Sequence, residues 1–311
     1  MRICVFGAGG VGGYFGGLLA RSGAEVTFIA RGEHLRALQA RGLTLRTVRE
    51  TFTVPVKATD EPRTVGPVDL VLFCVKSYDT ESAGRVLPDL LAPGGVVLTL
   101  QNGIDNEEKL EAIVGKGRVL GGAAYIWSTI TEPGVVTQAG GACKIAFGEL
   151  DGPSTGRARR ILETCQRASF PCELTTDLWK VLWEKFLLIC ALGGMTAVTR
   201  LPLGEILAHP QTREMFRGTM AEIHALARAE AVPLEEELVP RMMTFAEALD
   251  KAGRSSLYHD LTMGRRMELD ALNAKVVELG LRHGIPTPMN FAVTACLQPY
   301  AIAALRAHAS T

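Results

Sequence analysis

The first half of the chain alternates short apolar runs, typical of buried strands, with segments that have helical periodicity. The run 68–75 (VDLVLFCV) is almost continuously apolar, as expected of a parallel strand buried on both faces. Other strands are predicted at 3–6, 25–30, 96–100 and 118–125, and helices at 14–21, 82–91 and 107–114. This repeated order predicts a doubly wound parallel sheet.

After these elements the strand-like segments become shorter. They lie around 135–136 and at 144–147, and Gly140-Gly141 between them is a hairpin signal. We therefore expect antiparallel strands at the far edge of the predicted sheet.

The second half of the chain has few strand signals, and helical periodicity dominates from residue 177 onward. Helices are predicted over 177–192, 211–231, 234–251, 257–283 and 289–307. Pro171 and the polar stretch 173–177 separate the two patterns, so we place a domain boundary near residue 172. The longest apolar run, 186–198, is short for a membrane span and typical of a buried helix. The sequence predicts an α/β Rossmann-type domain at 1–172 and an all-α domain at 173–311.

A glycine-rich loop joins the first predicted strand to the first predicted helix. Its residues are Gly7, Ala8, Gly9, Gly10, Val11 and Gly12. This G-x-G-x-x-G spacing, between a strand and a helix, is typical of a dinucleotide site, where N–H groups of the helix N-terminus bind the phosphates. Gly7 would permit the tight turn, Gly9 would let the backbone approach a pyrophosphate, and Gly12 would allow close packing of helix on strand. The alternative, a simple turn, explains less of this arrangement.

Arg31 lies at the end of the second predicted strand, about 20 residues beyond the loop. An NAD site usually has Asp or Glu there to bind the ribose 2′-hydroxyl, whereas a guanidinium can pair with a 2′-phosphate. Arg31 therefore favours NADP(H). The alternative is that Arg31 is a solvated loop residue and that Glu33 binds the ribose of NAD.

Composition excludes several classes of protein. Lys plus Arg and Asp plus Glu both number 33, so no net charge favours nucleic acid or an anionic membrane as a partner. The seven cysteines form an odd set without a C-x-x-C pair, and this argues for reduced thiols in a cytoplasmic protein. The six histidines show no metal-ligand spacing, so we assign no metal. The N-terminus lacks the clean apolar stretch of a signal peptide.

Two polar residues follow neighbouring predicted strands of the first half. Lys76 comes directly after the run 68–75, and Asn102 follows the strand 96–100. Folds of this type bind ligands at the carboxyl ends of their strands. Lys76 could contact the cofactor phosphate or ribose, and Asn102 could bind the nicotinamide side or a substrate. Each could equally be an ordinary loop residue.

Lys185 lies on an apolar part of the predicted helix 177–192. Lys180 and Glu184 form an exposed charged stripe, and Lys185 lies off it. Its neighbours at helical spacing are Leu178, Val181, Leu182, Leu188 and Ile189. Such a lysine either extends its ammonium to solvent or is kept partly desolvated for a purpose. In the second case its pKa should fall, which suits a general acid.

The predicted helix 257–283 carries the last candidates. Glu268 shares a stripe with aliphatic residues, and Gly264 one turn earlier removes a side chain where a ligand would need room. The alternative is a helix-packing glycine and a carboxylate paired with Lys275. Ser256 lies at the predicted start of the helix, where an N-cap role is the default.

These stretches together resemble the ketopantoate reductases (2-dehydropantoate 2-reductases) over essentially the whole chain. The matching stretches are GAGGVGGYFG, ARGEHLRALQARGL, VKSYDTESA, LTLQNGIDNEEKL, WEKFLLICALGGMTAVTR, SSLYHDLTMGRRMELDALN and HGIPTPMN, in the family's order. The resemblance implies NADPH-dependent reduction of a 2-oxo acid to an R-configured 2-hydroxy acid. In the family this is 2-dehydropantoate to (R)-pantoate, a step of pantothenate and coenzyme A biosynthesis.

The resemblance also implies roles for individual residues. The matching positions are Lys185 as proton donor, Arg31 and Lys76 for NADP, Asn102 between cofactor and substrate, Ser256 for the substrate, and Glu268 for the cofactor or substrate. The first domain would then bind NADP, and the second would bind the small 2-oxo acid and carry the catalytic residue.

The chain departs from the family at four positions where well-studied members have asparagine. These are Ile189, Gly193, Leu203 and Gly253. A more apolar pocket would suit a different 2-oxo acid, so a D-2-hydroxy acid dehydrogenase is the alternative enzyme. An NADP-binding regulator without catalysis is the alternative from another class. The helical half could form a homodimer surface, although no heptad seam is evident.

Overall fold

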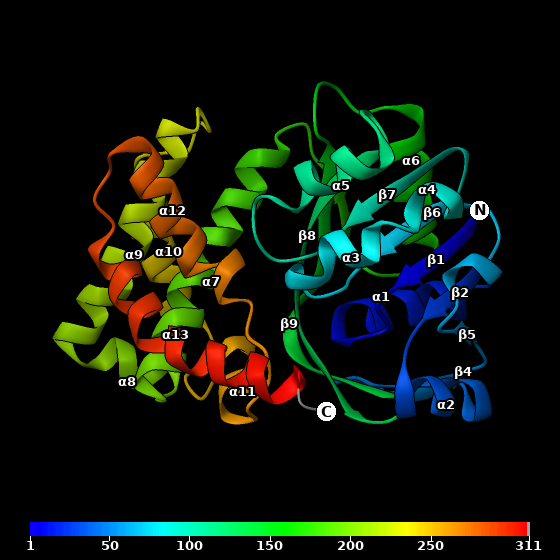
Figure 1. The fold of residues 1–311 in the computed structure, drawn as a ribbon, viewed down its shortest axis with the longest axis horizontal. Helices are drawn as coiled ribbons and strands as arrows, with labels where there is room; N and C mark the ends of the chain where they lie inside the picture. Colours follow the sequence, from blue (N-terminus) through cyan, green and yellow to red (C-terminus); the bar gives the residue numbers. More distant parts are fainter. Residues whose placement is uncertain (310–311) are drawn as a thin grey trace. The chain divides into compact units, whose positions relative to one another are not determined.

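The structure, a computed structural model, describes residues 1–309 (Figure 1). Its contacts divide the chain into two compact units. The sheet unit comprises residues 1–101 and 105–178, and the helical unit comprises 102–104 and the chain from 179 onward. The division falls at residue 178 rather than 172 because the short strand at 172–174 pairs with the sheet. Residues 310 and 311 of the predicted helical domain lie outside the described residues.

A ten-stranded sheet forms the centre of the sheet unit. Its strands are β1 (Arg2–Phe6), β2 (Glu25–Ile29), β3 (Leu43–Arg46), β4 (Thr51–Val54), β5 (Lys57–Thr59), β6 (Val68–Phe73), β7 (Leu91–Thr99), β8 (Val119–Glu132), β9 (Val135–Glu149) and β10 (Cys172–Leu174). The order is β4-β3-β9-β8-β7-β6-β1-β2-β5, with β10 beside β9. The β8–β9 and β3–β4 pairs are antiparallel, and the other pairs are parallel.

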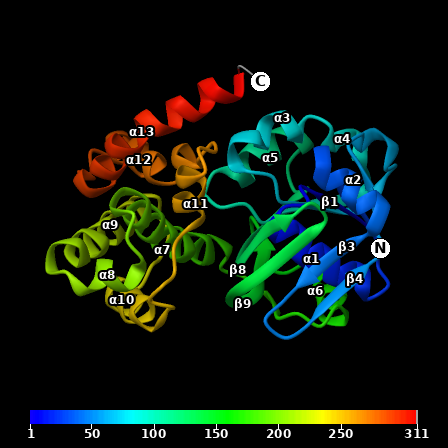
Figure 2. The same cartoon turned by 90° about the horizontal axis from the view of Figure 1, so that it is seen from below.

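Helices cover both faces of this sheet. They are α1 (Gly10–Arg21), α2 (Gly32–Arg41), α3 (Thr80–Gly84), α4 (Leu87–Leu90), α5 (Asn106–Val114) and α6 (Gly156–Arg167). Side chains alternate across β1: Val5 packs into the core that includes α1 and α6, whereas Phe6 packs into the core that includes α3, α4 and α5. Figure 2 shows these two groups of helices on opposite sides of the sheet. Successive side chains of a strand point to opposite faces, and both faces are covered, so the strands are apolar throughout.

The predicted hairpin at Gly140-Gly141 is wrong. The chain turns at Pro133-Gly134, where Gly134 has a φ of +83°, and β9 then runs unbroken through residues 140 and 141. Gly141, at a φ of +87°, lies where the pairing register with β8 shifts near Trp127. Its positive φ therefore produces a bulge in a long strand rather than a turn.

The helical unit is built around one long apolar helix, α7 (Leu178–Thr199). The others are α8 (Leu203–Ala208), α9 (Pro210–Ala229), α10 (Leu238–Ala248), α11 (Ser256–Thr262), α12 (Asn273–His283) and α13 (Pro288–Ala309). Figure 1 shows α9, α10, α12 and α13 gathered around α7. A Cβ on Gly194 would lie 2.7 Å from Val293 of α13, so this glycine lets the two helices pack closely. Among the described helices, α7 alone is long and apolar enough to span a membrane, but 67% of its most apolar stretch is buried, as in a core helix.

Two buried asparagines join three helices to α7. Asn273 donates to the Cys190 carbonyl (3.2 Å) and to Oδ1 of Asn290 (2.9 Å). Asn290 in turn donates to the Thr219 carbonyl (3.2 Å) and to the Glu222 carboxylate (2.7 Å). This network fixes α9, α12 and α13 against α7 by directional bonds within an otherwise apolar core.

The predicted single helix at 257–283 is wrong. The chain forms α11, then an irregular segment containing Gly264 at a φ of +63°, a short 3-10 turn (η3, Leu269–Ala271), and α12. A left-handed glycine ends α11 because ordinary helix cannot continue through it. Glu268 therefore lies outside the helix, and its predicted stripe with Leu261 does not exist.

Candidate nucleotide and substrate sites

The loop of residues 7–12, which we call the phosphate loop, makes a tight turn between β1 and α1. Gly7 has a φ of +102°, and a Cβ there would lie 2.9 Å from backbone atoms of Cys74 and Val75. The N–H groups of Gly7 and Ala8 face the Ile29 carbonyl at 3.3 and 3.2 Å. The loop is therefore held against the ends of β2 and of the segment after β6, and only glycine fits its first position.

The start of α1 is open and uncapped. Gly9 is its N-cap residue without a side-chain hydrogen bond, and no heavy atom lies within 4 Å of a Cβ built there. In contrast, a Cβ on Gly12 would lie 2.2 Å from the Gly7 carbonyl oxygen. The first N–H groups of a helix lack partners within it and carry its positive dipole end. Open space beside these donors is a cradle that fits a pyrophosphate.

Ser128 of β8 lies beside this cradle, and nothing in the sequence pattern marked it. A Cβ on Gly10 would lie 2.2 Å from the Ser128 carbonyl oxygen and 3.1 Å from its Oγ. The Ser128 hydroxyl is buried and has no hydrogen-bond partner among the described residues. Such groups usually have a partner, so an orphaned hydroxyl next to the phosphate loop fits a ligand atom.

Arg31 lies two residues beyond β2 and is the N-cap residue of α2. It is exposed and has no ion-pair partner in residues 1–309, whereas Glu33 lies 3.5 Å from Arg36. The positive charge predicted at the end of β2 is therefore present at Arg31. Glu33, the carboxylate of the NAD alternative, faces Arg36.

His34 of α2 is hydrogen-bonded to the β8–β9 turn. Its Nδ1 accepts a hydrogen bond from the Gly134 N–H (3.0 Å). Burial lowers the pKa of His34, and an interaction with the Ala8 carbonyl offsets part of that lowering. The ring is therefore neutral at pH 7 and ties two segments that lie 100 residues apart in the sequence.

The phosphate loop and Lys76 follow β1 and β6, which are neighbours in the sheet. From β1 the chain runs to β2 on one side and later reaches β6 on the other side. The crevice between two such strands is a topological switch point, the usual ligand site of an open α/β sheet. Lys76 is half-buried there.

Gln101 holds the two predicted polar loops in place, and sequence reasoning missed it. Its buried side chain donates to the Val75 carbonyl (3.0 Å), just before Lys76, and to Oγ1 of Thr80 (2.7 Å). Asn102 follows Gln101 directly and is half-buried, and contacts group it with the helical unit. The only sequence signal was a glutamine at the end of a buried strand.

On α7, Lys185 is half-buried, which fits either of the two environments that the sequence left open. Its charged neighbours are engaged elsewhere: Lys180 pairs with Glu235 (2.7 Å), and Glu184 pairs with Arg241 (3.0 Å). Lys180 and Glu184 thus do not form a stripe paired with one another. Lys185 itself lies among aliphatic positions of the helix.

Around α11, the N-cap assignment shifts by one residue. Ser255, not Ser256, is the N-cap residue, since its Oγ accepts a hydrogen bond from the Tyr258 N–H (3.0 Å). Ser256 is exposed, and its hydroxyl has no partner among the described residues, which leaves it available to a ligand. Glu268, in the segment before η3, is only 7% exposed, so it is a buried carboxylate.

The four departures from the family pattern fall into two groups. Leu203 is buried in the core, and its N–H donates to the Gly253 carbonyl (3.0 Å), so these two positions serve packing. Ile189 and Gly193 instead follow Lys185 along α7 at intervals of four residues, on one face of the helix.

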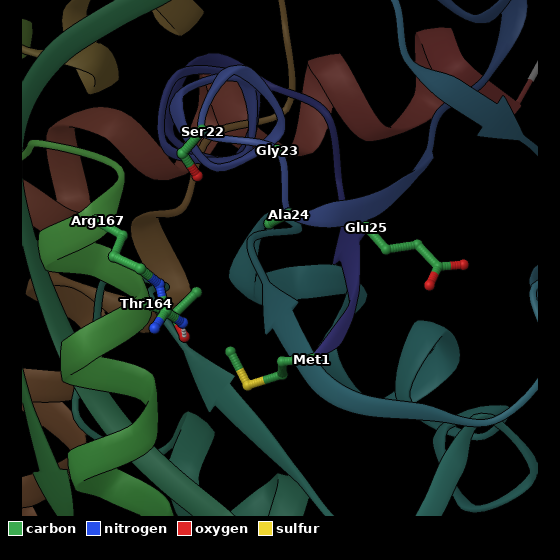
Figure 3. A pocket seen from close by; sticks show the side chains of 7 residues that line it. All are labelled: Met1, Ser22, Gly23, Ala24, Glu25, Thr164 and Arg167. Carbon is green, nitrogen blue, oxygen red and sulfur yellow. Dashed lines mark hydrogen bonds between the residues drawn. The ribbon is translucent and has the colours of Figure 1, made fainter.

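Two hollows of the sheet unit lie at the other end of its strands. One, of about 330 Å³, is lined by the start of β2, by Met1 and by α6, where Arg167 donates to Thr164 Oγ1 (3.0 Å) (Figure 3). The second, of about 560 Å³, shares Met1 and α6. The first lies at the amino ends of β1 and β2, and the second at the amino ends of β1, β6 and β7, so both are away from the phosphate loop. In residues 1–309 no three His, Cys, Asp or Glu side chains gather as metal ligands.

Comparison with known sequences covers nearly the whole chain. Residues 3–152 match the family described as Ketopantoate reductase PanE/ApbA, and residues 177–301 match Ketopantoate reductase PanE/ApbA C terminal. The 2-dehydropantoate 2-reductase of Halobacterium salinarum is 34% identical over 292 residues, which are 93% of this chain and 95% of that protein.

Solved structures share the architecture. The PanE/ApbA family ketopantoate reductase from Ralstonia eutropha superposes with a TM-score of 0.90 at 34% identity, covering 98% of this chain and 100% of that one. A ternary structure of D-mandelate dehydrogenase with NADH and anilino(oxo)acetate gives a TM-score of 0.90 at 20% identity, covering 98% and 99%, and shows the fold alone. The predicted fold class, a Rossmann-type sheet followed by an all-α domain, is confirmed.

Proposed function

Because the chain belongs to the ketopantoate reductase family of oxidoreductases, we propose that it uses NADPH to reduce a 2-oxo acid to an R-configured 2-hydroxy acid. The first substrate to test is 2-dehydropantoate, which names the relative from Halobacterium salinarum. The observation that carries the proposal is the open, uncapped helix start at Gly9, at the switch point of the sheet. Membership of a family of oxidoreductases argues against the non-catalytic regulator.

The preference for NADPH over NADH rests on the edge of β2. The Arg31 guanidinium has no ion-pair partner within residues 1–309 and can bind a 2′-phosphate by two parallel hydrogen bonds. Glu33, which would accept bonds from a ribose 2′-hydroxyl, lies against Arg36 instead. Titration with both nucleotides tests this preference, and tighter binding of NADH would contradict it.

The proposed mechanism divides cofactor binding, proton transfer and substrate orientation among these residues. The backbone N–H groups at the open start of α1 bind the pyrophosphate, Arg31 binds the 2′-phosphate, and Lys76 contacts the ribose or phosphate. NADPH supplies the hydride when it is bound. Lys185 holds a proton for the substrate oxygen, on which negative charge develops, and an ammonium in apolar surroundings stabilises that charge strongly. Ser256 orients the acid, Asn102 contacts both the cofactor and the acid, and Glu268 contacts the acid or the cofactor.

The direct test follows the loss of NADPH absorbance with 2-dehydropantoate and analyses the configuration of the product. We expect turnover and (R)-pantoate. The second candidate, a dehydrogenase of more apolar 2-oxo acids, is favoured by Ile189 and Gly193 on the face of α7 that carries Lys185. Measuring kcat/KM for a panel of 2-oxo acids with NADPH shows which of the two candidate activities is stronger. Tight NADPH binding without reduction of any acid would contradict both.

A further inference from the structure

Over the two turns of α7 that follow Lys185, the half-buried side chains are all aliphatic. Leu188, Ile189 and Leu192 lie three, four and seven residues after Lys185, and positions at this spacing share one side of a helix. All four residues are half-buried, so none is enclosed in the core. We call Leu188, Ile189 and Leu192 the aliphatic face. It contains no side-chain donor or acceptor.

Gly193, within the same stripe, adds no polar group either. A Cβ at this position would meet Leu257 of α11 at 3.7 Å from Cδ2 and 3.8 Å from Cβ, which is ordinary van der Waals contact. Leu257 is 2% exposed, so it packs over the glycine rather than standing free. The helix that bears Ser256 is thus seated on α7 by a leucine.

Two hydroxyls beside the Gly193 carbonyl, those of Thr196 and Ser255, are already bonded to one another. Thr196 Oγ1 donates to the Leu192 carbonyl (2.7 Å) and lies 2.7 Å from Ser255 Oγ. Ser255 Oγ therefore donates to Thr196 and accepts from the Tyr258 N–H (3.0 Å). Neither hydroxyl has a donor left for a ligand. Ser256 remains as the hydroxyl that can bind a substrate carboxylate.

We infer that this reductase prefers 2-oxo acids whose side chain is branched, aliphatic and free of hydroxyl groups. The inference rests on the proposed function, in which Lys185 meets the oxo group. The side chain of the substrate then extends along α7 from the oxo group and contacts the aliphatic face. The terminal hydroxyl of 2-dehydropantoate would lose water there without gaining a hydrogen bond, whereas a methyl group gains apolar contact.

The matched substrate is trimethylpyruvate, which has a hydrogen in place of the terminal hydroxyl of 2-dehydropantoate. Both acids are reduced in the same way, with a hydride delivered to C2 and a proton to the carbonyl oxygen. An apolar pocket distinguishes such pairs only moderately. We expect kcat/KM for trimethylpyruvate to exceed that for 2-dehydropantoate by about tenfold to a hundredfold.

The test compares this ratio in the full chain with NADPH for the wild type, Ile189→Asn and the milder Ile189→Thr. We expect both variants to shift the ratio toward 2-dehydropantoate, Asn by roughly tenfold. Val198→Asn is the control. Val198 is also half-buried, but it lies nine residues after Ile189 and therefore on the opposite side of α7. This variant should leave the ratio unchanged. Using a ratio removes any general loss of folded enzyme.

Three outcomes would overturn the inference. If the wild type prefers 2-dehydropantoate, the inference fails while the proposed function stands. If trimethylpyruvate is preferred but neither Ile189 variant changes the ratio, the aliphatic face does not set the preference. If NADPH binds but neither acid nor any other 2-oxo acid is reduced, the proposed function itself fails.

Discussion

At the scale of single residues, Gly9 and Gly12 lie three positions apart but meet different surroundings. Gly9 faces open space, whereas a Cβ on Gly12 would lie 2.2 Å from a backbone oxygen. We expect Gly9→Ala to keep the melting temperature of the free protein and to weaken NADPH binding, because a methyl group enters the cradle. Gly12→Ala should lower the melting temperature itself. Thermal melts with and without NADPH distinguish these effects, and equal destabilisation would contradict the assignment.

Arg31 should control the choice of nucleotide. Arg31→Ala removes a charge-assisted contact to the 2′-phosphate, which contributes about 2 kcal/mol, or roughly thirtyfold in affinity. NADH lacks this phosphate, so its affinity should hardly change. Arg41→Ala, at the far end of α2, is the control because Arg41 donates to the Pro133 carbonyl (3.2 Å). Isothermal titration with both nucleotides measures the difference, and parallel losses for NADPH and NADH would refute it.

His34 should make stability depend on pH. Its pKa in the folded protein is lowered from the ordinary value of 6.5 by burial. Below 6.5 the unfolded chain therefore binds a proton that the folded chain does not, so the free energy of unfolding falls as pH falls. His34→Gln should reduce this slope, leaving the protein less sensitive to acid than the wild type. Denaturant titrations at about pH 7 and about pH 5 give the free energy of unfolding of both proteins. If that free energy changes with pH by the same amount in the variant and the wild type, His34 is not the cause.

Sequence reasoning identified residues whose chemistry shows in local spacing and missed those defined by distant contacts. The phosphate loop and Lys185 lie in motifs of a few residues, so their placement could be predicted. His34 meets Gly134 across 100 residues, and the orphaned Ser128 hydroxyl gains meaning only beside Gly10. No periodicity encodes such pairs, because they arise from the order of strands in the sheet.

At the scale of elements, strands and long helices were predictable, and interruptions were not. A glycine at positive φ can turn the chain, kink a strand or end a helix, depending on what flanks it. Gly134 turns, Gly141 forms a bulge within β9, and Gly264 separates α11 from the segment before α12. The sequence pattern could not distinguish these cases, because the choice depends on the pairing with β8 and on tertiary packing.

The N-terminus of α13 should be the most sensitive element junction of the helical unit. Glu222 accepts hydrogen bonds from the N–H groups of Met289 (2.7 Å) and Asn290 (3.0 Å), and Asn290 also bonds Asn273. Asn290→Leu removes the side-chain bonds and leaves buried partners unsatisfied, at a cost of about 1–3 kcal/mol each. Gln298→Ala, on the same helix, should cost far less. Urea denaturation compares them, and equal loss in both would contradict a role for the network.

At the scale of the whole molecule, the residues proposed for cofactor binding and for proton transfer belong to different units. The phosphate loop and Arg31 lie in the sheet unit, and Lys185 lies in the helical unit. We expect Lys185→Ala to lower kcat by at least about a hundredfold, the usual contribution of a general acid, while NADPH affinity stays nearly constant. Lys180→Ala is the control, because that ammonium pairs with Glu235. A loss in kcat below about tenfold would require another proton donor.

The apolar character of α7 also has a consequence for biosynthesis. The helices that cover α7 come later in the chain, and α13, which packs against Gly194, comes last among the described elements. The sheet unit ends at residue 178, so it can fold while the helical unit is still emerging from the ribosome. During that interval α7 is a long apolar segment without its cover. Nascent chains arrested before α13 should therefore be the aggregation-prone and chaperone-dependent species of this protein.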